Sequence, residues 1–236
     1  MGINNSIYLY GHLGLGDMIS CNGIIRSYAE NYDKVYVFSK PKNTKNVMWM
    51  YRDLDNIYTM PMEDSQVTQF MQISPNNNYI IIGHNKLHEE LRKDPKGRFD
   101  QIFYKMANVP FEDKWNKFYL KRDLEKEKDT YYNKLGLKDN EEFIFVHDDK
   151  ERPMLPSKLP LGIKIIKPDR QDISIFDFLY TIEKAKEIHV IDSSFFNLID
   201  CLQLRSDDNL FFHKYVKIHL VGEGGTPTTK LNWKVL

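Results

Sequence analysis

Apolar and polar positions alternate between two patterns along the first 84 residues. Short runs of aromatic and β-branched residues predict buried strands, whereas apolar residues spaced three and four apart predict helices. The expected strands span residues 6–11, 34–39, 56–60 and 78–84. The expected helices begin at Asp17, at residue 43 and at residue 63. Strands that alternate with helices are typical of βαβ units and a parallel sheet.

The chain between residues 85 and 140 mixes aromatic and charged residues, which predicts helices and an irregular connection. Its last part, 121–135, predicts a long charged helix that ends at Gly136. The strand–helix alternation then resumes, and Ser174 with Asp177 forms a capping-box pattern at the start of a helix. The expected strands of this second series span residues 142–148, 162–167, 187–192, 209–214 and 217–222.

Two Rossmann-like α/β halves that face each other across a cleft fit this pattern better than one long sheet. The 236 residues suffice for two small domains. We expect an N-terminal Rossmann-like domain over 1–120, a helical linker over 121–140 and a C-terminal Rossmann-like domain over 141–236.

Composition excludes several classes of protein. Lysine and arginine balance aspartate and glutamate at 33 each, so no basic surface for nucleic acid is expected. Cys21 and Cys201 lie far apart in expected helices, which is typical of reduced core residues in a cytoplasmic protein. The sequence has no run of eighteen apolar residues, so no membrane span is predicted. A Met-Gly-x-x-x-Ser start matches the myristoylation pattern, so attachment to a membrane surface stays open beside a soluble location.

A glycine-rich turn follows the first strand at 11–17. The dinucleotide fingerprint is G-x-G-x-x-G with an acidic residue about twenty positions later. Here the spacing is reversed to G-x-x-G-x-G, formed by Gly11, Gly14 and Gly16. The next strand is followed by Lys40 instead of a carboxylate. An NADP-dependent oxidoreductase is therefore the weaker interpretation.

The same turn also presents Asp17 at the start of a helix. There the carboxylate either caps the helix or acts as a general base on a hydroxyl substrate above the strand ends. In the second case Gly14, Gly16 and His12 are expected to line the cleft beside that substrate. His84, which ends the fourth strand, either joins them or is a structural residue.

A second candidate site is Asp192-Ser193-Ser194, where a buried strand runs directly into an amphipathic helix. Free amides at a helix N-terminus suit a phosphate or diphosphate, and ligands of α/β sheets bind at this edge. Alternatively, Ser193 or Ser194 only caps the helix.

A third candidate is the segment 145–153, at the carboxyl end of the first strand of the second half. Arg152 or Lys150 is suited to neutralising a diphosphate, and His147 is expected to line the cleft. An exposed polar loop is the alternative. No second histidine stands at ligand spacing from His147, so no metal site is expected. The glycine-rich segment 222–229 is either a ligand loop or a turn.

Two of these segments resemble a known family when they are taken together. "GLGDMISCNGIIRSYAE" and "VIDSSFFNLIDCL" resemble motifs of the lipopolysaccharide heptosyltransferases and related GT-B glycosyltransferases. The resemblance implies that Asp17 is the base on the acceptor hydroxyl, and that Asp192, Ser193 and Ser194 hold the donor diphosphate. Phe195 and Asn197 depart from the family's glycine and histidine, which leaves the identity of the donor open.

The resemblance thus implies a glycosyltransferase whose C-terminal domain binds a nucleotide-diphosphate sugar as donor and whose N-terminal domain is the acceptor side, for a glycan hydroxyl. It favours inversion of the anomeric configuration, while a retaining outcome stays open. Stabilisation of the leaving diphosphate by helix amides and by Arg152 or Lys150 makes a divalent metal unnecessary. No other cofactor is expected. A non-catalytic module that binds a nucleotide or nucleotide sugar is the alternative from another class. The donor base, the sugar, the acceptor and the oligomeric state remain open at this level.

Overall fold

A computed structural model describes residues 5–93, 97–205, 208–217 and 227–236 of the chain. It divides into two units, each with its own sheet and core. The N-terminal unit runs to Lys121 and also includes Pro227 and Thr228, while the C-terminal unit starts at Arg122 and resumes at Thr229. Residues 122–140 therefore belong to the C-terminal unit.

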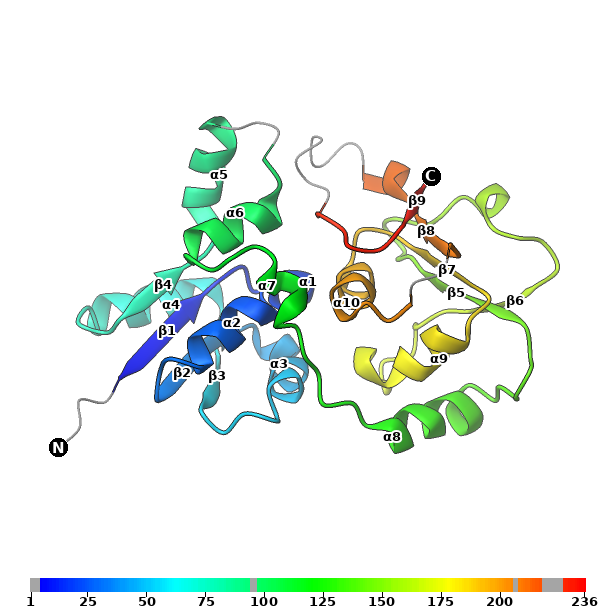
Figure 1. The fold of residues 1–236 in the computed structure, drawn as a ribbon, viewed down its shortest axis with the longest axis horizontal. Coiled ribbons are helices and arrows are strands. Elements are labelled where there is room, and N and C mark those ends of the chain that lie inside the picture. The colour runs from blue at the N-terminus through cyan, green and yellow to red at the C-terminus, as the bar shows by residue number, and fades with distance from the viewer. Residues whose placement is uncertain (1–4, 94–96, 206–207, 218–226) are drawn as a thin grey trace. The chain divides into compact units, whose positions relative to one another are not determined.

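The N-terminal unit is built on a four-stranded parallel sheet in the order β3-β2-β1-β4 (Figure 1). Buried side chains such as Ile7, Leu9 and Val35 lie along its central strands, which explains their strongly apolar sequence. The four strands predicted for this half are confirmed as β1 (Ser6–Tyr10), β2 (Lys34–Ser39), β3 (Ile57–Pro61) and β4 (Tyr79–Ile81).

The first predicted helix is divided in two near Cys21, which ends α1 and precedes α2. The Ser20 carbonyl lies at this break and accepts a hydrogen bond from the Tyr104 hydroxyl at 3.0 Å. A Cβ on Gly23 would lie 2.0 Å from the Asp113 carbonyl oxygen, so only glycine lets α2 approach α7 this closely. The helices of this unit are α1 (Leu15–Ser20), α2 (Asn22–Ala29), η1 (Pro41–Asn43), α3 (Thr44–Met50), α4 (Asp64–Ile73), α5 (His84–Lys93), α6 (Phe99–Met106) and α7 (Asp113–Asn116).

The C-terminal unit has a five-stranded parallel sheet in the order β6-β5-β7-β8-β9. Four strands lie within predicted ones, and most of the strand expected at 217–222 lies outside the described residues. The fifth strand, at the end of the chain, was not predicted. The strands are β5 (Phe143–His147), β6 (Lys164–Ile166), β7 (Glu187–Val190), β8 (Leu210–Phe212) and β9 (Lys234–Val235).

The helices of the C-terminal unit begin with α8 and one π-helical turn, η2, where a single helix was predicted. The chain leaves this segment through Gly136 at φ +63°, a conformation that favours glycine. The capping box at Ser174 is confirmed. The helices are α8 (Leu124–Asp129), η2 (Thr130–Lys134), η3 (Pro156–Lys158), η4 (Ile175–Phe178), α9 (Leu179–Lys184), α10 (Ser194–Leu202) and η5 (Lys214–Lys217).

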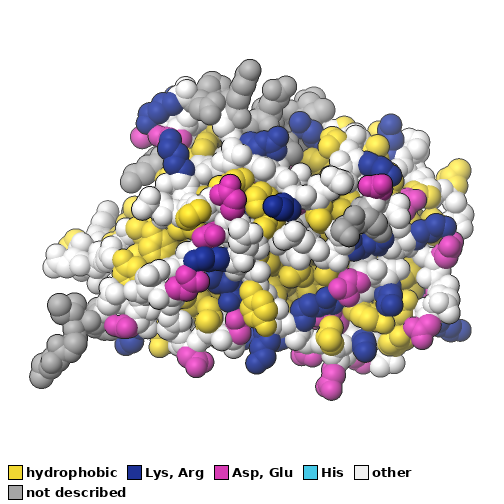
Figure 2. Space-filling model, viewed as in Figure 1, with side chains coloured by type: hydrophobic (Ala, Val, Ile, Leu, Met, Phe, Trp, Pro, Cys, Tyr) yellow, Lys and Arg dark blue, Asp and Glu magenta, His cyan; other side chains and the backbone are white. Residues whose placement is uncertain are grey.

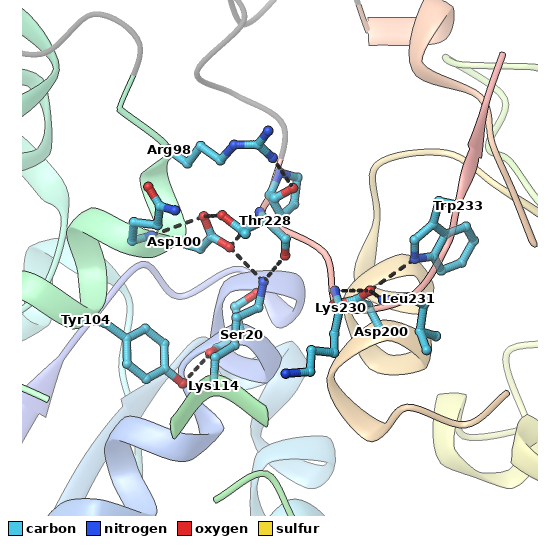
Figure 3. Close-up of polar contacts among 12 residues, drawn as sticks. Ser20, Arg98, Asp100, Tyr104, Lys114, Asp200, Thr228, Lys230, Leu231 and Trp233 are labelled. Carbon is cyan, nitrogen blue, oxygen red and sulfur yellow. Dashed lines mark hydrogen bonds and ion pairs between the residues drawn. The ribbon is translucent and has the colours of Figure 1, made fainter. Parts of the chain in front are cut away.

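The C-terminal tail contributes anchored residues to both units, and Figure 3 shows their contacts. In the N-terminal unit, the Thr228 amide donates to Asp100 at 2.8 Å and its carbonyl accepts from Lys114 at 2.6 Å. In the C-terminal unit, the Asp200 carboxylate accepts from the Lys230 and Leu231 amides and from the Trp233 indole. Each unit thus holds its part of the tail through a buried carboxylate.

Positive and negative side chains are interspersed over the face drawn in Figure 2, as the balanced composition predicts. Among the described residues, no helix has both the length and the apolar character needed to cross a bilayer.

Candidate functional site

Asp17 lies in the first turn of α1, next to the carboxyl edge of the N-terminal sheet. The residue that precedes this helix is Gly14, so Asp17 lies in the first helical turn and not at the N-cap position that one of the two alternatives gave it. Gly14 has an ordinary φ of −68°, which any residue can adopt. A Cβ there would lie 3.2 Å from the Asp17 Oδ2 atom, which is tighter than an ordinary contact. Glycine at 14 therefore leaves room for the Asp17 carboxylate.

His12 and His84 meet at this same edge. The His84 amide donates to His12 Nε2 at 2.8 Å, and the two rings lie 5.0 Å apart. Nδ1 of His12 lies 3.8 Å from the Asp17 carboxylate. Burial, followed by the neighbouring His84, lowers the pKa of His12 below its ordinary value. The structure thus brings together Asp17, His12 and His84 from α1, the β1–α1 loop and the start of α5.

Sequence reasoning missed Tyr10 and Asp64 as neighbours of this cluster. The Tyr10 hydroxyl donates to Asp64 at 2.9 Å, and the Tyr10 ring packs on the His84 ring with centroids 4.1 Å apart. Lys40, which follows β2, lies 3.7 Å from the other oxygen of Asp64. Burial and the Asp64 carboxylate raise the pKa of Tyr10. The sequence signalled only that a helix starts near Asp64.

In the C-terminal unit, His147 and Ser193 are adjacent because β5 pairs with β7. His147 Nδ1 lies 2.9 Å from the Ser193 hydroxyl, within hydrogen-bond distance. Ser193 precedes α10, yet its hydroxyl makes no capping hydrogen bond to the helix. Burial lowers the pKa of His147 to about 4, despite the opposing charges of Asp149 and Asp148, so the imidazole is neutral at pH 7.

Arg152 braces the turn between β7 and α10. Its guanidinium donates to Asp149 at 2.6 Å and to the Asp192 carbonyl at 3.0 Å. Burial raises the pKa of Asp149, but the hydrogen bonds and charge of Arg152 outweigh it and give a net lowering. Lys150 is exposed in the loop that follows β5, next to Asp149, and Ser194 begins α10. The predicted residues Lys150, Arg152, Asp192, Ser193 and Ser194 therefore lie around one sheet edge.

Both clusters consist of groups that can exchange protons, donate hydrogen bonds or carry positive charge. Within the described part of the chain, no group of three histidine, cysteine or acidic side chains is arranged to hold a metal ion. The N-terminal cluster offers a carboxylate to a hydroxyl, and the C-terminal cluster offers a helix N-terminus and cations to an anion.

Comparison with known proteins gives matches at the level of structure. No protein-family model matches the sequence, and the search of curated proteins gave no match. A family 9 glycosyl transferase from Veillonella parvula DSM 2008 matches with a TM-score of 0.52 and 9% identity, over 84% of this chain and 78% of that one. The E. coli ADP-heptose lps heptosyltransferase II matches with a TM-score of 0.52 and 10% identity, over 98% of this chain and 90% of that one.

At this identity the likeness establishes the fold. The chain has the GT-B type of architecture, with two Rossmann-like α/β units, as the sequence predicted.

Proposed function

We propose that the protein is a glycosyltransferase that moves a sugar from a nucleotide-diphosphate donor to a carbohydrate hydroxyl. The observation that carries this proposal is the likeness to the E. coli heptosyltransferase, which spans nearly the whole of both chains. The name of that enzyme gives ADP-heptose as its sugar nucleotide. For this chain we propose only the class of donor, because Phe195 and Asn197 depart from the family motif.

On the acceptor side, Asp17 takes the proton of the attacking hydroxyl. The hydroxyl oxygen forms a bond to the anomeric carbon while the bond from that carbon to the diphosphate breaks. The bonding electrons leave with the diphosphate, and the configuration inverts in this single displacement. Asp17 is supported as the base by its place at the carboxyl edge of the sheet, where α/β proteins bind ligands.

On the donor side, the leaving diphosphate binds at the start of α10. Amides near Ser193 and Ser194 donate hydrogen bonds, and Lys150 contributes positive charge from the neighbouring loop. Arg152 holds the Asp192 carbonyl and adds its charge to the same turn. These groups supply the stabilisation of the leaving group without requiring a divalent metal.

A thermal-shift panel of nucleotide diphosphates and nucleotide sugars identifies the donor class. A selective ligand stabilises the folded protein by mass action and so raises its Tm. At a free ligand concentration of a hundred times Kd, the gain in stability is about 2.7 kcal/mol. The hit is then incubated with candidate glycan acceptors, and release of the nucleoside diphosphate is measured. Binding with no loss of sugar from any acceptor pair would favour the non-catalytic module instead.

Asp17→Asn is the direct test of the proposed base. We expect the transfer rate to fall by about 10²–10⁴-fold, because the amide cannot accept the proton. Binding of the nucleoside diphosphate should persist, since the donor residues lie in the other unit. Asp55→Asn, at an exposed carboxylate, is the matched control and should leave the rate unchanged. An Asp17→Asn protein that is folded and fully active would remove Asp17 from this role.

A further inference from the structure

The hydrogen bonds around His12 determine which of its ring nitrogens carries the proton. An amide N–H can only donate, so Nε2 of His12 must accept the hydrogen bond from the His84 amide, which measures 2.8 Å. A neutral imidazole with an accepting Nε2 carries its proton on Nδ1. Nδ1 is the atom that lies 3.8 Å from Asp17 Oδ2. The proton of His12 is therefore on the side of the carboxylate.

The backbone after β4 is shaped to make this contact. Gly83 and His84 both have positive φ, +84° and +55°, and for His84 this is an uncommon conformation. A Cβ on Gly83 would lie 2.5 Å from the His12 ring, so only glycine admits the imidazole at this position. The Phe103 ring packs on the imidazole with centroids 5.3 Å apart. Strained backbone at the end of a strand is typical of functional sites.

The same geometry excludes one role for His12. A general base needs a free lone pair, and the lone pair on Nε2 is occupied by the His84 amide. The charges that act on the ring come from Asp64, Lys40, His84 and His88, beside the Asp17 carboxylate next to Nδ1. Because burial lowers its pKa, the ring is neutral at pH 7 and acts as a hydrogen-bond donor.

We propose that His12 is a positioning residue that directs its Nδ1–H at Asp17 and holds that carboxylate in place for the acceptor hydroxyl. The distance of 3.8 Å shortens to a hydrogen bond when the site is occupied, as contacts of catalytic groups often do. The role in transfer rests on the proposed function of Asp17. The tautomer of His12 and its effect on Asp17 do not depend on that function.

Two substitutions distinguish a His12 that acts as a hydrogen-bond donor from a His12 whose ring only fills space. The amide nitrogen of His12→Asn stands in for Nδ1–H, whereas His12→Leu keeps a side chain of moderate size but has no donor. Loss of a partner that orients a functional group typically costs about 10–100-fold, and we expect this loss in kcat for His12→Leu. The asparagine variant should retain most of the rate. The acid limb of the pH–rate profile should shift to higher pH in His12→Leu, because an unsupported carboxylate binds a proton more readily.

To test whether His12 acts through Asp17, His12→Leu is also made in the Asp17→Asn protein. There, His12→Leu should cause no further loss, because the group that it positions is already absent. An equal loss in both backgrounds, or an asparagine variant no better than the leucine variant, would overturn the proposal.

NMR of the protein without substrate gives a readout independent of catalysis. With ¹⁵N-labelled histidine, we expect His12 to be protonated at Nδ1 and unprotonated at Nε2 in the wild type. With ¹³C-labelled aspartate, the pKa of Asp17 should rise in His12→Leu. The opposite tautomer, or an unchanged pKa, would contradict the proposal even in an active enzyme. If both NMR results are as expected and no nucleotide sugar is turned over, the proposed function is wrong, but the effect of His12 on Asp17 stands.

Discussion

Lys114 and Asp100 form an ion pair that is almost completely removed from solvent. Their side chains are 1% and 0% exposed, and the distance from Nζ to the carboxylate is 2.7 Å. A buried ion pair costs much of its attraction in desolvation, so its value depends on further hydrogen bonds. Thr228 supplies them, because its amide and hydroxyl donate to Asp100 and its carbonyl accepts from Lys114. The pair is therefore a polar anchor for the tail in the N-terminal unit.

Lys114→Met leaves the Asp100 carboxylate buried without its countercharge. We expect the free energy of unfolding of the N-terminal unit to fall by about 3–5 kcal/mol, measured by urea denaturation. A further Asp100→Leu substitution should recover part of this loss, because no unpaired charge then remains. Lys117→Met is the control at a partly exposed pair with Glu30, and it should cost about 0.5 kcal/mol. Equal losses for the two methionine variants would show that burial of the pair is not what matters.

At the scale of elements, most strands and helices could be predicted because their signal is local. Runs such as 34–39 and the spacing of Met18, Ile25 and Tyr28 report burial directly in the sequence. The strand β9 has no such signal, since it consists of two exposed residues that pair with β8. The segment just before it contacts Asp200, thirty and more residues away in the chain. A local pattern cannot contain such contacts.

The candidate site divides in the same way. Asp17, His147 and Ser193 could be proposed from the sequence because each stands where an expected strand gives way to a loop or helix. The partners of these residues could not be. The hydrogen bond between His147 and Ser193 joins positions 46 apart, and the bond from the His84 amide to His12 joins positions 72 apart. The positive φ at Gly83 has a meaning only once the His12 ring is placed against it.

Asp200 offers a test of how the tail strand is held. One of its oxygens, Oδ1, accepts from the Lys230 amide, the Leu231 amide and the Trp233 indole. Asp200→Ala leaves these donors without their acceptor, and we expect a loss of about 3–5 kcal/mol in the free energy of unfolding. Asp200→Asn keeps an oxygen at the same place and should cost about 1–2 kcal/mol, the value of the charge alone.

Hydrogen exchange provides the local measurement for these two variants. The amides of Lys230 and Leu231 should exchange much faster in Asp200→Ala than in Asp200→Asn. Identical exchange in both variants and the wild type would mean that pairing of β9 with β8 holds the tail without Asp200.

At the scale of the whole molecule, the C-terminal unit contains a series of linked hydrogen bonds in which each donor and acceptor is fixed by its neighbour. His189 Nε2 donates to the Glu187 carboxylate at 3.0 Å, so His189 Nδ1 must accept from His213 Nε2, also at 3.0 Å. His213 Nδ1 then accepts from the Tyr215 hydroxyl at 2.9 Å, and that hydroxyl accepts from the Leu155 amide. Both histidines are buried and neutral in this arrangement. Protonation of either ring replaces an accepting nitrogen with a donor.

Two histidines, His213 of this series of hydrogen bonds and His147 beside Ser193, make the stability of the C-terminal unit dependent on pH. Burial, and for His213 also the neighbouring His189, lowers the pKa of His213 and of His147 to about 4. An unfolded histidine titrates near 6.5, so between pH 6.5 and 4 the unfolded chain binds protons that the folded chain does not. The contribution of the neutral histidines to the free energy of unfolding is therefore fully present above pH 6.5. It is lost as the pH is lowered towards 4, by about 2–3 kcal/mol for each of the two histidines.

Trp233 can report this effect for the C-terminal unit alone. The other two tryptophans, Trp49 and Trp115, lie in the N-terminal unit, so Trp49→Phe and Trp115→Phe together leave a single reporter. In this background the urea midpoint seen by Trp233 fluorescence should decrease steadily from pH 7 to pH 4.5. His213→Gln should lower the midpoint at pH 7 and flatten its dependence on pH, because one of the titrating groups is gone. His88→Gln, in the N-terminal unit, should leave the slope seen by Trp233 unchanged. A midpoint that stays constant over this range, or an equal slope in His213→Gln, would contradict the assignment.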